Sequence, residues 1–275
     1  MKMTSNVHTH STYCDGANTL REMAEHALSL GFTDLGFSSH SPTPFDPDFP
    51  GIVDEQVYRS EIAALKEEYC GRLGILCGVE QEAYRPVNRE DYDYIIGSVH
   101  YMPFDDGAMI PNDNSRTLVD VAARKYYRGD CLAMARDYYS MVVSSTQRDK
   151  PDIIGHFDLI TKFNGDNSLF DENGKTYRDM ALEALDAVID TVVPYGGMIE
   201  VNTSVMVRKL RNNPYPAPFL MRRMVQRNVR AIITSDSHQA STLNTGFDAA
   251  LEIMRDVGFR SMALLKNGAF VDVNI

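Results

Sequence analysis

The sequence predicts an α/β protein built as a parallel barrel. Short apolar or β-branched runs alternate with longer segments of helical periodicity along the 275 residues, which is the pattern of parallel strands joined by crossover helices. A chain of this length that is 44% apolar can bury one large core, and α/β barrels of this size commonly form one domain. Histidines and carboxylates recur where the predicted strands end, the position at which such barrels carry their catalytic groups. We therefore expect a single domain over residues 1–275.

Seven strands are predicted from the apolar runs, and each ends at polar residues that could belong to a catalytic or metal-binding site. The strands end at His10, 38–40, Glu80, 99–100, His156, Asn202 and Ser235. A further strand near 262–265 is expected to close or edge the sheet. Because the carboxyl ends of parallel strands meet at one mouth of a barrel, we expect these distant segments to converge there.

Helices are expected between the strands, where apolar residues recur three and four positions apart. They are predicted over residues 20–30, 54–69, 132–143, 180–193, 219–227 and 247–257. Gly31 and Gly258 follow the first and last of these, as glycine commonly follows a helix. Residues 41–53 and 102–115 are rich in Pro, Gly, Asp and Asn and are expected to be long loops. Each follows a strand that ends in histidine, so we expect them to wall a substrate pocket.

Charge and cysteine content narrow the partners and the compartment. The formal net charge is −11, and no dense Lys/Arg run offsets it, which disfavours long nucleic acid but not a small anion held by metal ions. The four scattered cysteines form no CxxC pair and fit a reducing cytoplasm, with Cys14 expected to be a bystander. The opening residues show no signal segment, and no run reaches the roughly 20 apolar residues of a membrane span. We expect a cytoplasmic protein without a membrane partner, and the sequence carries no signal for a particular oligomeric state.

Nine side chains at the strand ends are candidate metal ligands. His8 and His10 lie two apart in an extended segment and so project to one face, and Asp236 and His238 repeat that spacing. The full candidate set is His8, His10, Asp15, His40, Glu80, His100, His156, Asp236 and His238. Imidazole and carboxylate together suit zinc, iron or manganese. Because nine ligands exceed the four of a closed zinc site, we expect two or three divalent ions.

Glu80 is predicted to bridge two of these ions. It ends the strand over 75–79, and a bridging carboxylate keeps two cations about 3.5 to 4 Å apart, a spacing that generates a hydroxide and clamps a phosphoryl group. His26 lies inside the first predicted helix and is expected to be structural. Asp158, two residues after His156, is expected to orient a neighbouring ligand or to serve the loop.

These motifs and their order resemble the PHP (polymerase and histidinol phosphatase) family, in its histidinol-phosphate phosphatase branch. The motifs are His8-Thr9-His10, Cys14-Asp15-Gly16, Phe37-Ser38-Ser39-His40-Ser41, Gly78-Val79-Glu80, Gly97-Ser98-Val99-His100, Gly155-His156-Phe157-Asp158, Glu200-Val201-Asn202-Thr203 and Ser235-Asp236-Ser237-His238. They span nearly the whole chain. The resemblance implies a distorted (β/α)7 TIM-like barrel with a trinuclear metal centre at the C-terminal ends of its strands.

The resemblance also implies which residues hold each ion and the substrate phosphate. The implied ligand sets are His8, His10, Glu80 and Asp236 for the first ion, Glu80, His100 and His156 for the second, and Asp15, His40 and His238 for the third. None of the nine is substituted, which implies an active enzyme. Lys162 and Arg208 are expected to bind the phosphate. Because Val205-Met206-Val207 departs from the glycine-containing spacing of the family, Lys209 and Arg211 remain alternatives to Arg208.

The implied activity is that of a metal-dependent phosphomonoesterase. The best match is histidinol-phosphate phosphatase, which converts L-histidinol phosphate and water to L-histidinol and phosphate in histidine biosynthesis, by in-line attack of a metal-bridging hydroxide. Cations and positioning supply most of the catalysis of phosphoryl transfer. Glu80, Asp15 and His238 are the expected catalytic residues, Glu80 as the bridge and the other two beside the ion that assists the leaving alkoxide.

Three other functions fit part of the pattern. A PHP-type phosphodiesterase or nucleotidase would act on nucleotides or short oligonucleotides, but the acidic balance and the lack of a basic, aromatic-lined track disfavour it. A metal-dependent amidohydrolase barrel also begins with His-x-His, although Glu80 and the final Asp-x-His pair fit it less well. A noncatalytic metal-binding regulatory subunit would keep the site without turnover. Chelator-sensitive release of phosphate from p-nitrophenyl phosphate separates an enzyme from such a binder.

Overall fold

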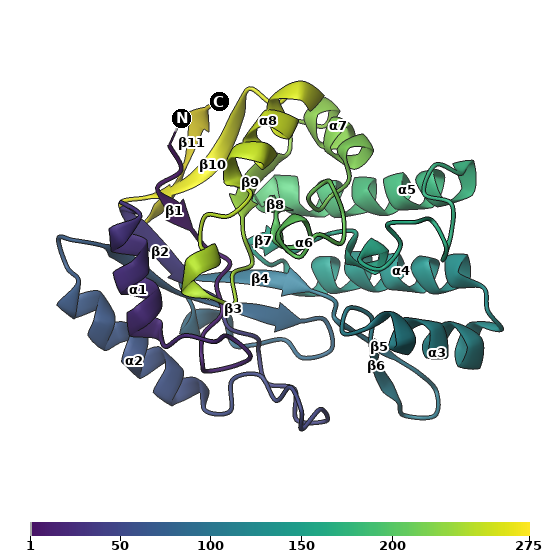
Figure 1. The fold of residues 1–275 in the computed structure, drawn as a ribbon, viewed down its shortest axis with the longest axis horizontal. Helices are drawn as coiled ribbons and strands as arrows, with labels where there is room; N and C mark the ends of the chain where they lie inside the picture. Colours follow the sequence, from purple (N-terminus) through teal and green to yellow (C-terminus); the bar gives the residue numbers. More distant parts are fainter. Residues whose placement is uncertain (1) are drawn as a thin grey trace.

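A curled parallel sheet forms the centre of the protein in the computed structural model, which describes residues 2–275 (Figure 1). Seven strands follow one another in chain order, each parallel to the next: β1 (Ser5–Asn6), β2 (Asp34–Phe37), β3 (Gly74–Glu82), β4 (Tyr94–Ser98), β7 (Ile153–Ile154), β8 (Met198–Asn202) and β9 (Arg230–Thr234). Strand β10 (Ser261–Lys266) continues the sheet parallel to β9, and β11 (Ala269–Asn274) is antiparallel to β10. The predicted α/β fold class, a distorted barrel of seven parallel strands, is confirmed.

Backbone bridges draw the barrel together at the C-terminal ends of its strands. Thr9, after β1, forms a parallel bridge with Ser237, after β9. Ser237 N donates to His8 O at 3.1 Å, and His10 N donates to Ser237 O at 2.8 Å. Strand β10 also packs against β1. The first and seventh strands therefore meet where the predicted ligands lie.

The barrel interior below the C-terminal ends of the strands is filled by apolar side chains, which we call the apolar floor. Its side chains are Val7, Leu76, Tyr94, Ile96, Ile153, Met198, Ile232, Ala263 and Leu265. The Tyr94 hydroxyl donates to Val7 O at 2.5 Å and to Phe37 O at 3.1 Å. A Cβ at Gly36 or Gly78 would lie 2.4 Å or 2.3 Å from Tyr94, so these glycines make room for its side chain.

Helices cover the outside of the sheet (Figure 1). They are α1 (Leu20–Ser29), α2 (Glu55–Glu68), α3 (Arg116–Tyr127), α4 (Cys131–Asp149), α5 (Lys175–Val192), the short α6 (Ser204–Val207), α7 (Pro218–Gln226) and α8 (Phe247–Val257), with 3-10 turns η1 (Arg89–Asp91), η2 (Leu159–Thr161), η3 (Val193–Tyr195) and η4 (Ala240–Thr242). Side-chain caps begin several of them; Thr19 and Glu22 form a capping box at α1, which satisfies N–H groups that the first helical turn leaves open. The larger apolar cluster lies between helices and sheet. No helix of the described residues is long and apolar enough to cross a membrane.

Several elements differ from the sequence prediction. Residues 102–115 are not one open loop, because β5 (Tyr101–Pro103) and β6 (Met109–Pro111) form a hairpin within it. Helix α3 was missed because it buries only Val119, Ala122 and Ala123 among charged residues. Strand β11 was missed although the Asn267-Gly268 pair, both at positive φ, is a sequence signal for a hairpin turn. Helix α5 also begins at Lys175 rather than at residue 180.

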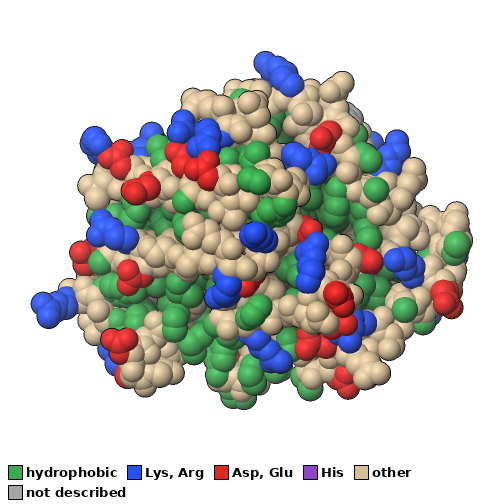
Figure 2. Space-filling model, turned by 180° about the vertical axis from the view of Figure 1, so that it is seen from behind, with side chains coloured by type: hydrophobic (Ala, Val, Ile, Leu, Met, Phe, Trp, Pro, Cys, Tyr) green, Lys and Arg blue, Asp and Glu red, His purple; other side chains and the backbone are tan. Residues whose placement is uncertain are grey.

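The face opposite to the view of Figure 1 carries basic and acidic side chains interspersed over the surface (Figure 2). They are not gathered into one basic patch on this face. Many basic side chains of the described residues are paired with acidic ones, as Arg89 is with Asp152 and Arg230 with Asp272. This face therefore offers no continuous cationic track for a polynucleotide.

Asp34 fastens the β10–β11 turn to the barrel. Its carboxylate accepts hydrogen bonds from Asn267 N at 3.0 Å and Gly268 N at 2.8 Å. We expect Asp34→Ala to lower the free energy of unfolding by about 2 kcal/mol, because two backbone N–H groups lose a charged acceptor, as measured by urea denaturation. Asp272→Ala, which removes the exposed carboxylate of an ion pair with Arg230, is the control and should cost less than about 1 kcal/mol. Equal losses in the two variants would contradict this role.

Candidate metal centre

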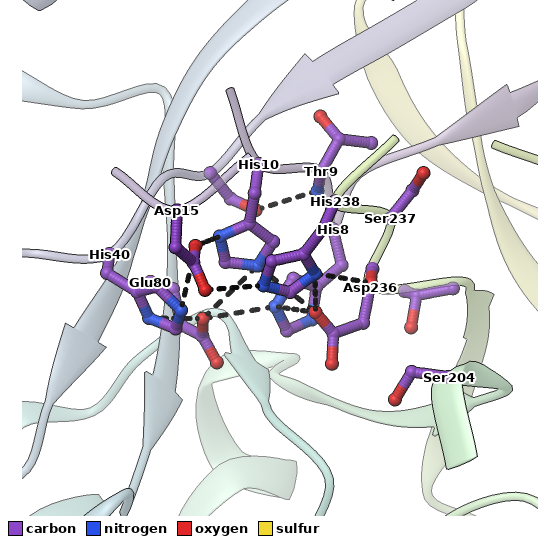
Figure 3. A network of polar contacts seen from close by, with 12 residues as sticks. His8, Thr9, His10, Asp15, His40, Glu80, Ser204, Asp236, Ser237 and His238 are labelled. Atoms are coloured by element: carbon purple, nitrogen blue, oxygen red, sulfur yellow. Dashed lines mark hydrogen bonds and ion pairs between the residues drawn. The ribbon is translucent and has the colours of Figure 1, made fainter. Parts of the chain in front are cut away.

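The nine side chains predicted as metal ligands lie together at the mouth of the barrel. Figure 3 labels His8, His10, Asp15, His40, Glu80, Asp236 and His238 among them. They form four overlapping groups whose ligand atoms lie within 4.8 Å of one another: His10, Asp15, His40 and His238; His8, His10 and Asp236; His8, Glu80 and His156; His40, Glu80 and His100. Within residues 2–275 these groups contain no other His, Cys, Asp or Glu. The structure therefore brings the distant strand ends together, as the sequence predicts.

The segment that directly follows β1 points His8 and His10 into the barrel, because the side chain of Thr9 between them points outward. Thr9 Oγ1 donates to Gly36 O at 2.7 Å, and Thr9 N donates to Ser38 Oγ at 3.1 Å. Since side chains alternate along an extended strand, the histidines on either side of Thr9 face the barrel axis.

The last pair of ligands is placed by a sharp backbone turn. Asp236 has a φ of 48°, a left-handed conformation that aspartate tolerates better than most residues. The following residue, Ser237, bonds to the segment after β1, and its Oγ donates to Gln239 O at 2.6 Å. Asp236 and His238 consequently project from the same side of this turn (Figure 3).

Glu80 lies at the centre of the cluster and is 1% exposed. Its Oε1 accepts a hydrogen bond from Ser98 Oγ at 2.7 Å and lies 2.9 Å from His156 Nε2. Its Oε2 lies 2.9 Å from His40 Nδ1 and 3.3 Å from His8 Nε2. The two oxygens thus face different histidines, the arrangement that a bridging carboxylate requires.

Two carboxylates outside the predicted set orient histidines of the cluster. Glu200 Oε2 lies 2.8 Å from His8 Nδ1, and Glu82 Oε1 accepts a hydrogen bond from His100 Nδ1. An imidazole that donates from Nδ1 to a carboxylate keeps the Nε2 lone pair for a metal. Nε2 of each histidine faces Glu80.

Sequence reasoning had signals for both of these carboxylates. Glu200 lies on β8, within the Glu200-Val201-Asn202-Thr203 motif, and it also accepts from His156 N at 2.5 Å. Glu82 stands two residues after Glu80 on β3 and so projects to the same face. Neither was distinguished from an ordinary strand carboxylate, because support of a histidine is a contact that sequence spacing does not reveal.

Unpaired buried atoms show that the site suits cations. His8 Nε2, His10 Nε2 and Glu80 Oε2 are buried and have no hydrogen-bond partner among the described residues. His100 Nε2 lies 3.2 Å from His156 Nε2, so two ring nitrogens face each other. Such atoms are costly to bury unless a proton or a cation lies between them. The donor set therefore fits metal ions, and imidazole with carboxylate suits zinc, iron or manganese.

The electrostatics of the cluster also favour positive charge. Burial alone lowers the pKa of a histidine, but the carboxylates around His8 outweigh burial and raise its pKa well above the usual value. The same balance, with Glu82 the strongest carboxylate, raises the pKa of His100 to about 9. Burial raises the pKa of Glu80, but the imidazoles around it dominate and hold that pKa well below its usual range. By contrast, burial and two neighbouring histidines lower the pKa of His10 to about 3.

A cavity of about 310 Å³ opens beside the cluster. Lys162 and Arg208 line it, and Lys162 Nζ lies 2.9 Å from Asp113 Oδ2. Arg211 is not among the lining residues, because its guanidinium is paired with Glu172. Of these two arginines, Arg208 is therefore the one placed at the cavity.

The structure also shows the surroundings of three further residues that the sequence analysis singled out. Cys14 lines the cavity, and its Sγ lies 3.4 Å from His10 Nδ1. Asp158 accepts a hydrogen bond from Ala217 N at 2.9 Å, so its contact is with a loop rather than with a ligand side chain. His26 lies in α1, outside the four ligand groups.

Fold and site together define an α/β barrel with a polynuclear metal-binding site at its mouth. A family model described as PHP domain matches residues 6–204. The chain belongs to the PHP domain family.

Particular relatives sharpen this classification. The chain is 33% identical to a protein of Deinococcus radiodurans named "Probable histidinol-phosphatase", over 93% of this chain and 94% of that one. It is 26% identical to the "Histidinol-phosphatase" of Bacillus subtilis, over 89% and 97%. The crystal structure of the histidinol phosphate phosphatase of Lactococcus lactis complexed with zinc, L-histidinol and phosphate has a TM-score of 0.70, covers 98% of both chains and is 17% identical. This last likeness supports the fold.

We expect Glu80→Gln to lose bound metal and to lower p-nitrophenyl phosphate hydrolysis by at least about 100-fold, because an amide cannot bridge two cations as a carboxylate does. Metal content by mass spectrometry and initial rates on the same preparation check this. Glu25→Gln, an exposed site on α1, is the matched control. Near-normal metal content and activity in Glu80→Gln would refute the bridging role.

Proposed function

We propose that this chain is a metal-dependent phosphomonoesterase that hydrolyses L-histidinol phosphate to L-histidinol and phosphate, a step of histidine biosynthesis, and that residues 1–275 work as one barrel domain. The observation that carries the proposal is the complete set of nine ligand-type side chains converging at the barrel mouth. The same chain aligns over 93% of its length with a relative named for this activity.

The residues of the mouth have separate tasks in this reaction. The nine ligand-type side chains would hold the divalent ions, with Glu80 shared between two of the ligand groups. When bound, such ions polarise phosphate oxygens and supply a nucleophile at neutral pH. Lys162 and Arg208 neutralise charge on the phosphate and orient it. Asp15 and His238 line the cavity with Asp15 Oδ2 3.0 Å from His238 Nε2, so together with His40 they would hold an ion that can assist departure of the leaving oxygen.

The wall of the cavity away from the cluster suits the rest of this substrate. Among the described cavity carboxylates, Asp48 is the one whose side chain has no hydrogen-bond or ion-pair partner. The others are Asp15, Glu82, Asp113 and Asp236, each paired with a histidine or with Lys162. Phe49 and Tyr101 line the same wall. A free carboxylate with two aromatic rings suits a substrate that carries an ammonium group and an aromatic ring.

The loop that presents Asp48 is tied to its surroundings. Asp46 Oδ1 accepts from Asp48 N at 3.1 Å, and Asp46 Oδ2 accepts from Tyr101 OH at 2.6 Å. Thr43 N donates to Pro50 O at 2.8 Å, which closes the loop on itself. Hydrogen bonds therefore hold the loop that carries Asp48 in place. Residues of 41–53 line the cavity, as the sequence predicts.

The substrate is tested by comparing kcat/KM for L-histidinol phosphate, nucleoside monophosphates and a short oligonucleotide on one preparation of defined metal content. We expect L-histidinol phosphate to exceed the others by at least about 100-fold, since two added cationic and aromatic contacts favour it. Preference for a nucleotide would overturn the proposed substrate in favour of a PHP-type nucleotidase.

Asp48→Asn tests recognition of the ammonium group. We expect it to lower kcat/KM for L-histidinol phosphate by about tenfold, the equivalent of one charge-assisted contact, and to leave p-nitrophenyl phosphate hydrolysis unchanged because that ester has no ammonium group. Asp105→Asn, on the neighbouring hairpin, is the control. An equal loss on both substrates would show that Asp48 does not select for the amine.

A further inference from the structure

Lys162 and Arg208 stand on two different irregular segments. Lys162 directly follows η2, in the segment after β7, and Arg208 directly follows α6, in the segment after β8. Regular structure does not fix the distance between their side chains. Their relative position therefore depends on contacts between the two segments.

An arginine–carboxylate pair joins these segments. Arg211 Nη1 lies 2.7 Å from Glu172 Oε1, and Nη2 lies 2.5 Å from Glu172 Oε2. Each side chain is 13% exposed. Nη1 also donates to Thr161 O at 2.7 Å, and Thr161 directly precedes Lys162. One guanidinium thus holds three acceptors on the segment that carries Lys162, a task that suits the planar donors of arginine and not a lysine.

The carboxylate of this pair is itself held in place. Asn164 is fully buried, and its Nδ2 donates to Glu172 Oε1 and to Phe170 O, both at 2.9 Å. Asn164 Oδ1 accepts from Leu169 N at 2.8 Å. These bonds fold the segment back on itself, so Glu172 keeps a fixed position relative to Lys162.

The backbones of the two segments also touch beside this pair. A Cβ at Gly165 would lie 2.8 Å from Leu210 O, next to Arg211 in the chain. Asp158 Oδ2 accepts from Ala217 N at 2.9 Å, which joins the far end of the same two segments. The ion pair consequently lies between two other contacts that join the same two segments.

We propose that the Arg211–Glu172 ion pair is a positioning device for phosphate binding, which sets the separation of Lys162 and Arg208 without touching the phosphate. The inference rests on the proposed function in so far as these two residues bind a phosphate ester. A displacement of about 1 Å in such a pair of groups weakens binding and turnover by tenfold or more. Arg211 and Glu172 are thus positioning residues.

The test uses the full-length, metal-loaded protein and the variants Glu172→Gln and Arg211→Lys. The Kd of inorganic phosphate is measured by calorimetry, and kcat and KM with p-nitrophenyl phosphate. We expect both variants to raise the phosphate Kd and the KM by about tenfold. Arg223→Lys is the matched control, because Arg223 makes an equivalent bidentate pair with Asp186 on the outer face, at 2.8 Å for each bond, and it should leave both values unchanged.

Other outcomes overturn the proposal in distinct ways. Folded variants with wild-type phosphate Kd, KM and kcat, and a loss only in thermal stability, would mean a purely structural ion pair. A loss in Arg211→Lys without one in Glu172→Gln would mean that Arg211 contacts the phosphate itself. If one of the two variants does not fold, the phosphate Kd of the other variant tests the proposal. Failure of the wild type to hydrolyse L-histidinol phosphate would contradict the proposed substrate and leave this comparison intact.

Discussion

The site depends on one buried carboxylate. Glu80 lies at the centre of the barrel mouth with 1% of its surface exposed, and a buried carboxylate is costly unless positive charge or hydrogen bonds offset it. Ser98 supplies one hydrogen bond, and the remaining neighbours are imidazoles from the ends of four strands. Removing those histidines would leave an uncompensated charge in the core, so the ligands and the fold around them are coupled.

The barrel meets this requirement by separating its interior into two layers. The apolar floor around Tyr94 excludes water from one half, and the polar cluster occupies the other. The bridges from Thr9 to Ser237 and from His40 to Glu80 extend the sheet past the regular strands, so ligands stand on backbone that is still hydrogen-bonded. Sites built on such backbone hold their geometry better than sites on free loops.

The convergence of the nine candidate ligands could be predicted from the sequence because their signals are local. Spacing of two in His8-x-His10 and Asp236-x-His238 reports a shared strand face, and strand ends of a parallel barrel must meet. Glu200 and Glu82 could not be distinguished, since their role is a contact with a histidine from another strand. The places of Arg208 at the cavity and of Arg211 beside Glu172 likewise required the structure, because both residues follow the same motif. Helix α3 and strand β11 escaped because few of their residues are buried.

The central claim about the site is that nine side chains bind a cluster of ions around Glu80. Anomalous diffraction from a crystal of the metal-loaded protein, recorded on both sides of the metal absorption edge, tests this most directly. We expect two or three anomalous peaks among the nine side chains, with Glu80 oxygens contacting at least two of them. A single peak bound without Glu80, or no peak at the barrel mouth, would contradict it.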